Sequence, residues 1–308
     1  MNIVVIGAGG VGGYFGGKLA QSGNKVTFLV RGKHLDVIKN KGLQIKSIKG
    51  DFLVHPEANN NYAIIEKADL VILGVKSWQI LDVAKEMKPF LSEKAMVLPL
   101  QNGADNADKL LSVLPKENVL AGLCKIVSKV EEPGVINHFA FEPEIIFGEY
   151  TNDKTERILA LKDVFDGAGF KSTLADDIHL AIWKKFQFIT SVSGIAALTR
   201  VTFGEMRAQE KIRQIIFNTA QEIVAIANKK GIDLTEEDSQ FVLKAVENSH
   251  TNTTASMQRD VMEGKPSELE NFNGYIVKMG EELGIEIPTN TFIYNCLLPQ
   301  ENIARKLV

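Results

Sequence analysis

The segment that most constrains the fold is at the N-terminus, where the apolar residues Ile3–Ile6 run directly into the glycine-rich segment Gly7–Gly12. A short uninterrupted run of mostly β-branched residues is typical of a strand that is buried on both faces of a parallel sheet. Glycines occupy the first, third and sixth positions of the next segment, and Tyr14–Gln21 can continue as a helix. A strand, a G-x-G-x-x-G turn and a helix in this order predict a Rossmann-type unit.

Each motif glycine has its own part in binding a dinucleotide. One glycine allows the tight turn, one lets the backbone approach a pyrophosphate, and one lets helix and strand pack closely. The phosphates would then lie over the helix N-terminus. A glycine-rich turn that binds nothing is the alternative, and the flanking strand and helix argue against it. The expected cofactor contacts come from the whole turn: Gly7, Ala8, Gly9, Gly10, Val11 and Gly12.

Length and composition exclude several classes of protein. A chain of 308 residues is long enough for two domains, and its 45% hydrophobic and 24% charged residues are ordinary for a globular protein. A net charge of −3 argues against a nucleic-acid partner. No apolar run approaches the ~20 residues of a membrane span, and the first residues already form a strand instead of a signal peptide. We therefore expect a cytoplasmic protein that binds neither nucleic acid nor membrane.

Metal and disulfide chemistry is not expected either. The two cysteines, Cys124 and Cys296, are far apart and form no C-x-x-C pair. The five histidines show no ligand spacing, so structural or surface roles are favoured over a metal site.

The end of the second predicted strand, Lys25–Val30, indicates which dinucleotide binds. An NAD-binding domain usually places an acidic residue here, to accept hydrogen bonds from the ribose 2′-hydroxyl. This chain places Arg31 there, followed by Lys33 and His34. A guanidinium can bind a 2′-phosphate through paired charge-assisted hydrogen bonds, so NADP (NADPH) is the predicted cofactor. The alternative is a solvated basic loop.

Two further buried strands, Ala68–Val75 and Ala95–Leu100, end in polar residues. Ligands of an open parallel sheet bind outside the carboxyl ends of its strands. Lys76 and Gln79 after the first of these strands, and Asn102 after the second, are therefore placed to contact the cofactor. Purely local roles, in a helix-opening loop or an Asn-Gly turn, stay open for these residues.

The remaining pattern divides the chain in two. A hairpin is predicted from Leu43–Lys46 and Phe52–Val54, and Val119–Gly148 resembles an antiparallel extension of the sheet. After a helix at Thr155–Phe165 and a short strand at Phe170–Ala175, only helical periodicity follows. We predict an α/β NADP-binding Rossmann domain over residues 1–174 and an all-α substrate and catalytic domain over residues 175–308.

One lysine in the helical half is a candidate proton donor. Reduction of a carbonyl by NADPH needs a group that polarises the carbonyl and protonates the alkoxide, and lysine with a pKa of ~10.4 stays charged for this purpose. Lys185, Ile189 and Ser193 follow at four-residue steps and share one helix face. Spacing alone, however, leaves Lys185 as an ordinary solvated charge.

Taken together, the motifs resemble the ketopantoate reductase family (2-dehydropantoate 2-reductases), and the resemblance spans essentially the whole chain. The order and separation of the pieces carry it: Gly7–Gly12, Arg31, Lys76–Gln79, Gln101–Gly103, Trp183–Lys185, Ser256–Asp260 and Glu268–Gly274.

The resemblance implies a role for individual residues. Lys185 would be the general acid, and Glu268 would lie near it and near the nicotinamide ribose. Asn102 would lie between nicotinamide and substrate, and Ser256 would hold the keto-acid carboxylate. Ser128 would be a further cofactor contact, while Lys76 would help hold the cofactor and Arg31 its 2′-phosphate. Without the resemblance, Ser256 is simply a helix residue and Glu268 a first-turn acid.

Three residues that depart from the family pattern bear on the identity of the substrate. Well-studied members carry asparagines where this chain has Ile189, Ser193 and Phe203. The resemblance implies that those amides recognise the hydroxyl end of the substrate, and here only Ser193 offers that hydroxyl a polar partner. The leading hypothesis is NADPH-dependent reduction of 2-dehydropantoate to pantoate in pantothenate biosynthesis. Alternatives are reduction of another 2-oxo acid in a re-lined pocket and a non-catalytic NADP-binding sensor; the oligomeric state, with a homodimer as one option, stays open.

Overall fold

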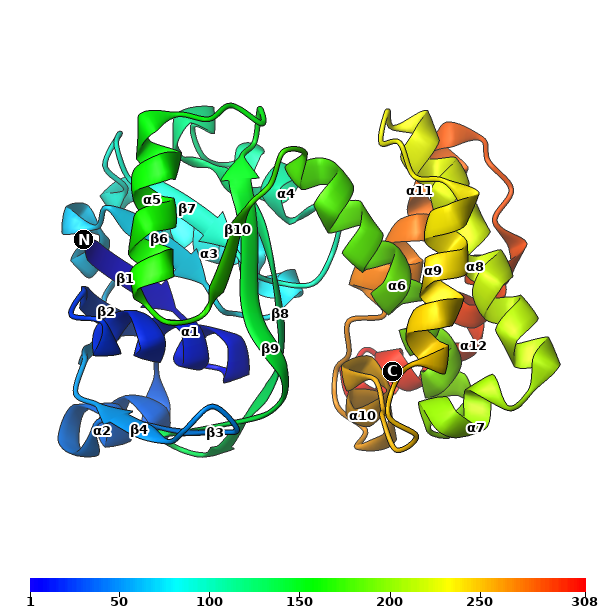
Figure 1. Ribbon diagram of the computed structural model, residues 1–308, viewed down its shortest axis with the longest axis horizontal. Helices are drawn as coiled ribbons and strands as arrows, with labels where there is room; N and C mark the ends of the chain where they lie inside the picture. The colour runs from blue at the N-terminus through cyan, green and yellow to red at the C-terminus, as the bar shows by residue number, and fades with distance from the viewer. The chain divides into compact units, whose positions relative to one another are not determined.

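The computed structural model describes all residues 1–308, and the chain forms two compact units, Met1–Ile178 and His179–Val308 (Figure 1). The predicted boundary at Leu174 is the last residue of strand β10, and the division of the structure falls just after it, where helix α6 begins.

A five-stranded parallel sheet forms the first layer of unit 1. Its order is β5-β2-β1-β6-β7, and every neighbouring pair is parallel. The strands are β1 (Asn2–Ile6), β2 (Lys25–Leu29), β5 (Glu57–Asn59), β6 (Leu70–Leu73) and β7 (Met96–Pro99). The predicted Rossmann-type fold class is thereby confirmed. Because the chain leaves β1 in opposite directions on its two sides, the switch point of the sheet lies between β1 and β6.

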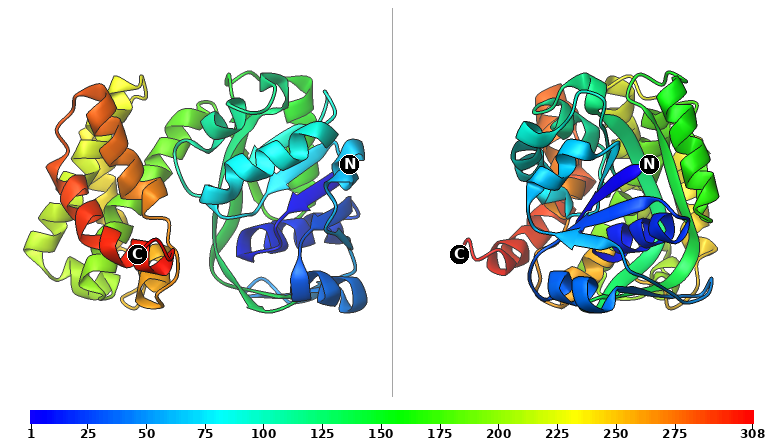
Figure 2. Two further views of the ribbon diagram at one scale, coloured as in Figure 1. Left: turned by 180° about the vertical axis from the view of Figure 1, so that it is seen from behind. Right: turned by 90° about the vertical axis from the view of Figure 1, so that its left-hand side faces the viewer.

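The central strands β1, β6 and β7 are almost entirely apolar because both faces of the sheet are covered there. Ile3 and Val5 of β1 face the main core, which also contains Phe15 and Leu19 of helix α1 (Gly10–Gln21). Val4 points to the other face and is equally buried. Helix α3 (Ile80–Met87), cyan in the left view of Figure 2, covers that second face. Double coverage explains why the sequence shows continuous apolar runs instead of alternation.

The predicted antiparallel extension forms a separate second sheet instead of continuing the first. Its order is β10-β9-β3-β4, with β8 paired to β9, and only a bridge between Val97 and Val119 joins it to the parallel sheet. The strands are β3 (Leu43–Ser47), β4 (Phe52–Val54), β8 (Leu120–Glu132), β9 (Val135–Glu149) and β10 (Lys171–Leu174). The predicted hairpin of β3 and β4 is confirmed as an antiparallel pair.

Glycines on α1 allow the second sheet to pack closely against this helix. A Cβ on Gly16 would lie 2.6 Å from Phe28 of the parallel sheet, whereas a Cβ on Gly13 would lie 2.7 Å from Ile136 of the second sheet. The helix is therefore in close contact with a sheet on either side. Close contact on both sides is possible only because these positions carry no side chain.

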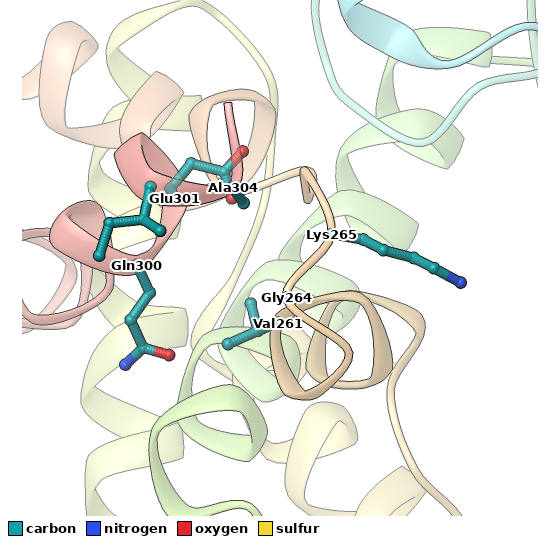
Figure 3. A pocket seen from close by; sticks show the side chains of 7 residues that line it. Val261, Gly264, Lys265, Gln300, Glu301 and Ala304 are labelled. Carbon is teal, nitrogen blue, oxygen red and sulfur yellow. The ribbon is translucent and has the colours of Figure 1, made fainter. Parts of the chain in front are cut away.

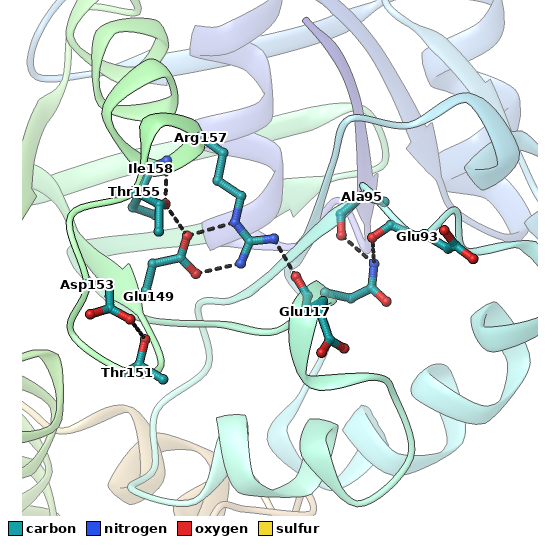
Figure 4. Close-up of polar contacts among 10 residues, drawn as sticks. Glu93, Ala95, Glu117, Glu149, Thr151, Asp153, Thr155, Arg157 and Ile158 are labelled. Carbon is teal, nitrogen blue, oxygen red and sulfur yellow. Dashed lines mark hydrogen bonds and ion pairs between the residues drawn. The ribbon is translucent and has the colours of Figure 1, made fainter.

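The other elements of unit 1 complete its surface. Arg157 of α5 donates to both carboxylate oxygens of the buried Glu149 at the end of β9, and to the carbonyl of Glu117 (Figure 4).

A basic loop was one alternative for the residues after β2, but the structure shows a helix, α2, with Arg31 as its N-cap. The remaining elements are α2 (Gly32–Lys41), α4 (Asn106–Leu111), α5 (Glu156–Gly167) and the 3₁₀ turns Tyr62–Lys67, Ser77–Gln79, Lys88–Phe90 and Lys116–Asn118.

Unit 2 is entirely helical, as predicted. Helix α8 packs against α9, α11 and α12, and a π-helical turn, η5, runs directly into α11. None of the helices combines the length and apolar character needed to cross a membrane. The elements are α6 (Ile178–Thr199), α7 (Phe203–Arg207), α8 (Glu210–Lys229), α9 (Glu236–Glu247), α10 (Ser256–Met262), η5 (Glu270–Gly274), α11 (Tyr275–Leu283) and α12 (Pro288–Ala304).

Candidate functional site

The carboxyl edge of the parallel sheet gathers the predicted cofactor residues of unit 1. The glycine turn follows β1, Arg31 follows β2, Lys76 follows β6 and Asn102 follows β7. Since these four strands are parallel neighbours, their carboxyl ends lie along one edge.

The three glycines of the G-x-G-x-x-G motif divide into two that the fold requires and one that it does not. Gly7 has a φ of +91°, and a Cβ on Gly12 would lie 2.1 Å from the Gly7 carbonyl oxygen. A Cβ on Gly9 would meet only the carbonyl oxygen of Gly74, at an ordinary 3.6 Å. Packing within the protein therefore explains Gly7 and Gly12, whereas the space beside Gly9 is open to a ligand.

No side chain of the protein caps the N-terminus of α1, where Gly9 is the N-cap residue, and no acidic residue in its first turn offsets the helix dipole. The first amide groups of a helix lack intrahelical partners and carry the positive end of the helix dipole. These features fit the pyrophosphate of a dinucleotide.

Ser128 gives a second, independent sign that the site accepts a polar ligand. Strand β8 passes so close to α1 that a Cβ on Gly10 would lie 2.5 Å from the Ser128 carbonyl oxygen and 2.9 Å from Ser128 Oγ. This Oγ is buried and has no hydrogen-bond partner in the protein. An orphaned hydroxyl beside the helix N-terminus fits a cofactor contact, because buried polar groups are normally paired.

Arg31 has an acidic neighbour that its local sequence does not show. Its Nη2 lies 3.2 Å from Oε2 of Glu86 on α3, and both side chains are largely exposed. Burial and a hydrogen bond to Glu86 raise the pKa of Tyr62 to about 12, so the Tyr62 hydroxyl stays a donor to the same carboxylate. No sequence pattern signals this group, because Tyr62, Glu86 and Arg31 come from three separate elements.

The loops after β6 and β7 are fixed by their own side chains. The Lys76 amide donates to Gln79 Oε1 (3.1 Å), so Gln79 serves a local cap, while Lys76 Nζ lies 5.5 Å from the centre of the Trp78 ring. Gln101 Nε2 donates to the Leu73 carbonyl at 2.9 Å. This bond ties the loop that carries the half-buried Asn102 to the end of β6.

In unit 2, the predicted proton donor lies on α6 next to a second lysine. Lys184 is exposed and forms an ion pair with Asp238 of α9 at 2.9 Å. Lys185 is half-buried, and it shares a helix face with the half-buried Ile189 and the buried Ser193 at the next two four-residue steps. The two adjacent lysines therefore differ in burial, which the sequence alone does not show.

The turn of α6 that carries Lys185 packs against η5 and α11. The Phe186 ring lies 6.4 Å from that of Phe272 and 5.9 Å from that of Tyr275. More than two turns further along α6, a Cβ on Gly194 would lie 2.6 Å from Asn273 Oδ1, so the glycine allows η5 to approach α6 closely. Asn273 in turn donates to Asn290 Oδ1 of α12 at 3.0 Å.

Glu268 precedes η5 and is held by a clamp on its neighbour, Ser267. The amide and hydroxyl of Ser267 donate to the buried Glu301 carboxylate, with the hydroxyl at 2.6 Å. Arg305 binds both Glu301 Oε1 (2.6 Å) and the Ser267 carbonyl (2.9 Å). The clamp thus anchors the backbone directly before Glu268, which is only 7% exposed, to the C-terminal end of α12. Sequence reasoning missed this clamp.

A hollow of about 200 Å³ lies beside this clamp, between α10 and α12 (Figure 3). Glu301 lines it, but none of the predicted site residues does. Ser256, the first residue of α10, is exposed, and Phe203 is a buried residue of α7. No group of three or more acidic, histidine or cysteine side chains is arranged to hold a metal ion.

Comparison with known proteins matches both units to one family. The model "Ketopantoate reductase PanE/ApbA" matches residues 3–152, and "Ketopantoate reductase PanE/ApbA C terminal" matches residues 177–301. An uncharacterized oxidoreductase of Bacillus subtilis (strain 168), YkpB, is 32% identical over 294 residues, which are 96% of this chain and 97% of that protein. A 2-dehydropantoate 2-reductase of Pyrococcus abyssi (strain GE5 / Orsay) is 29% identical, over 99% and 100% of the two chains.

The fold is also that of a solved enzyme. The ternary structure of D-mandelate dehydrogenase with NADH and anilino(oxo)acetate matches with a TM-score of 0.90, over 99% of this chain and 100% of that one. At 22% identity, this match shows a shared fold alone. The two family models span most of the chain, and the resemblance in the motifs is confirmed: the chain belongs to the ketopantoate reductase family of oxidoreductases.

Proposed function

We propose that this protein is an NADPH-dependent reductase of a 2-oxo acid, with 2-dehydropantoate as its substrate and pantoate as its product. The observation that carries the proposal is Lys185, a half-buried lysine on the turn of α6 that packs against η5. Glu268 lies just before η5, next to the clamped Ser267. A sensor that only bound NADP would have no need of a proton donor. The product would serve pantothenate biosynthesis in the cytoplasm.

The residues of unit 1 would hold the cofactor. The amides of Gly7–Gly12 and the Ser128 hydroxyl are suited to the pyrophosphate side, and Arg31 and Lys76 to the 2′-phosphate side. Asn102 carries an amide that can both donate and accept, which suits a place between nicotinamide and substrate. NADPH, when bound, supplies the hydride.

The residues of unit 2 would manage the substrate and the proton. The Lys185 ammonium would donate a hydrogen bond to the 2-oxo oxygen and then protonate the developing alkoxide. Glu268 would accept a hydrogen bond and hold the ammonium and the nicotinamide ribose in place. Ser256 would bind the substrate carboxylate and Ser193 its hydroxyl.

The cofactor preference is testable at Arg31. Arg31→Ala is expected to lower kcat/KM for NADPH by about 10-fold and to leave kcat/KM for NADH nearly unchanged, because only NADPH carries the phosphate that Arg31 would bind. Steady-state assays with both cofactors measure this. Glu86→Gln is the matched variant: it removes the charge that competes for Arg31 and repels the phosphate, so the NADPH/NADH ratio should rise. An unchanged ratio in Arg31→Ala would show that Arg31 does not bind the phosphate.

The substrate is testable at Ile189, which offers the hydroxyl of 2-dehydropantoate no hydrogen bond. Ile189→Asn should lower KM for 2-dehydropantoate and leave activity on 2-oxoisovalerate similar or poorer. Discrimination between the two would shift by about 1–2 kcal/mol, the usual worth of one buried hydrogen bond to a substrate. Ile189→Val is the control, since it changes the volume without adding a polar group.

A panel of 2-oxo acids, followed by NADPH absorbance, tests the proposed function as a whole. A micromolar KM for 2-dehydropantoate in the wild type, not lowered further by Ile189→Asn, would support the assignment of pantoate as product. It would also rule out the alternative of a re-lined pocket for another 2-oxo acid. A preference for an apolar 2-oxo acid would favour that alternative. NADPH binding without turnover of any acid would favour the sensor. The oligomeric state, for which a homodimer is one option, is measured separately by light scattering on the purified protein.

A further inference from the structure

The imidazole of His34, on the first turn of α2, bridges two backbone segments. Its Nε2 lies 2.8 Å from the carbonyl oxygen of Ala8, in the glycine turn after β1. Its Nδ1 lies 2.9 Å from the amide nitrogen of Gly134, in the turn between β8 and β9. Both ring nitrogens are therefore engaged with main-chain groups that cannot rotate away.

These partners fix the protonation state of the ring. A backbone carbonyl only accepts and a backbone amide only donates, so Nε2 must carry the proton and Nδ1 must not. Only the neutral Nε2–H form satisfies both contacts. A second proton on Nδ1 would face the Gly134 N–H at 2.9 Å and break that contact.

One bridged segment is the glycine turn of the proposed cofactor site, and the other follows the strand that carries Ser128. Ala8 stands between Gly7 and Gly9, so its carbonyl sets the course of the turn whose amides would face the pyrophosphate. Gly134 has a φ of +82°, and its carbonyl accepts from the Gln44 amide at 2.9 Å, so the His34 bond completes its pairing. Strand β8, which ends at this turn, carries Ser128 beside Gly10.

We propose that His34 is a positioning residue for the dinucleotide: its neutral ring holds the glycine turn and the β8–β9 turn in register, and its protonation loosens both and weakens dinucleotide binding. The inference rests on the proposed function, because it concerns the same site. His34 would touch no reacting atom, and its protonation would make dinucleotide binding depend on pH.

The surroundings of His34 favour the neutral form. Burial lowers the pKa of His34 from its usual 6.5, opposed by the hydrogen bond to Ala8. On its own helix Arg31, Lys33 and Asp36 are exposed, and the glycine turn has no titratable group. On the β8–β9 hairpin Glu131 is paired with Lys46 at 2.5 Å, and Glu132 is exposed.

The lowered pKa of His34 determines how the stability of the protein changes with pH. Because the folded-state pKa lies below the unfolded one, the unfolded chain binds more protons at mildly acidic pH. The contribution of His34 to stability is therefore present above pH ~6.5 and is lost as the pH falls through the lowered pKa. Binding to the ordered turn should weaken over the same range.

The test is calorimetric titration of the full-length protein with NAD⁺ at pH 7.5 and pH 5.5. NAD⁺ is the probe because it lacks the 2′-phosphate, whose own ionisation near pH ~6 would obscure the result. The wild-type Kd should rise as the pH falls, toward a limit of about fivefold for the fully protonated ring, as expected for one lost hydrogen bond. His34→Gln can donate to Ala8 and accept from Gly134 without titrating, so its Kd should be nearly independent of pH. His34→Leu should bind about fivefold more weakly at both pH values.

Each outcome decides between the alternatives. A wild-type Kd that does not change with pH, or a His34→Gln variant with the wild-type pH dependence, would overturn the inference alone. If His34→Leu does not fold, as judged by near-UV circular dichroism, the comparison of the wild type with His34→Gln still decides. No NAD⁺ or NADP⁺ binding by the wild type at pH 7.5 would instead contradict the proposed function.

Discussion

Replacing Lys185 with alanine is expected to lower kcat by at least about 100-fold, the usual scale for loss of a general acid. Without the ammonium, nothing polarises the 2-oxo group or protonates the alkoxide as the hydride arrives. The affinity for NADPH should change far less, because the glycine turn, Arg31 and Ser128 all belong to unit 1. Stopped-flow turnover and fluorescence titration with NADPH measure the two quantities separately.

The adjacent lysine provides a matched control. Lys184 is exposed and paired with Asp238 at 2.9 Å, so Lys184→Ala should keep near-normal kcat and lose only ~0–1 kcal/mol of stability. If Lys185→Ala is folded and turns over substrate as fast as Lys184→Ala, Lys185 is not the proton donor. A large loss in both variants would point to a structural effect of altering α6.

The parallel sheet could be predicted because its signals are local. Each strand is a short apolar run next to a turn, and the G-x-G-x-x-G spacing places a helix directly after the first strand. Parallel pairing then puts the polar residues that follow each strand along one edge, so Arg31, Lys76 and Asn102 could be placed from the sequence. The predicted elements of the helical half, such as α8 and α9, followed from periodicity in the same way.

The second sheet could not be predicted because its cause lies in long-range packing. The glycine spacing predicts a phosphate-binding turn over Gly7–Gly12 but gives no role to Gly13 and Gly16, which are explained by the approach of two different sheets. The pair of Arg31 with Glu86 and the clamp of Glu301 on Ser267 join residues far apart in the sequence. No spacing rule connects such residues, so only the folded chain shows them.

The candidate catalytic residues depended on family resemblance more than on pattern. Periodicity places Lys184 and Lys185 on one helix but does not say which is solvated, and burial answers that question only in the structure. Glu268 has no local signature, since it precedes a π-helical turn instead of opening an ordinary helix. Such turns are frequent at functional sites, in agreement with the proposed role of Glu268.

The second large effect is expected from replacing a glycine of the turn. Gly9 is the position at which cofactor binding can be weakened without damage to the fold. Gly9 has φ −70°, which alanine adopts freely, and its added Cβ would meet only the Gly74 oxygen at 3.6 Å. Gly9→Ala should therefore shift the melting temperature by no more than a few degrees. The same methyl group would occupy the space of the pyrophosphate, so Kd for NADPH should rise about 100-fold, the upper range for one overpacked contact.

Two other glycines show why Gly9 is the informative choice. Gly12→Ala would place a Cβ 2.1 Å from the Gly7 oxygen, so loss of binding there would reflect a damaged fold. Gly167→Ala, at the end of α5 with nothing within 4 Å of the added Cβ, is the control for a glycine replacement as such, and it should bind NADPH normally. Calorimetric titration of the three variants, with thermal unfolding of each, makes the comparison. If Gly9→Ala binds NADPH as tightly as Gly167→Ala, the pyrophosphate does not lie over this turn, and the dinucleotide site proposed for unit 1 is wrong.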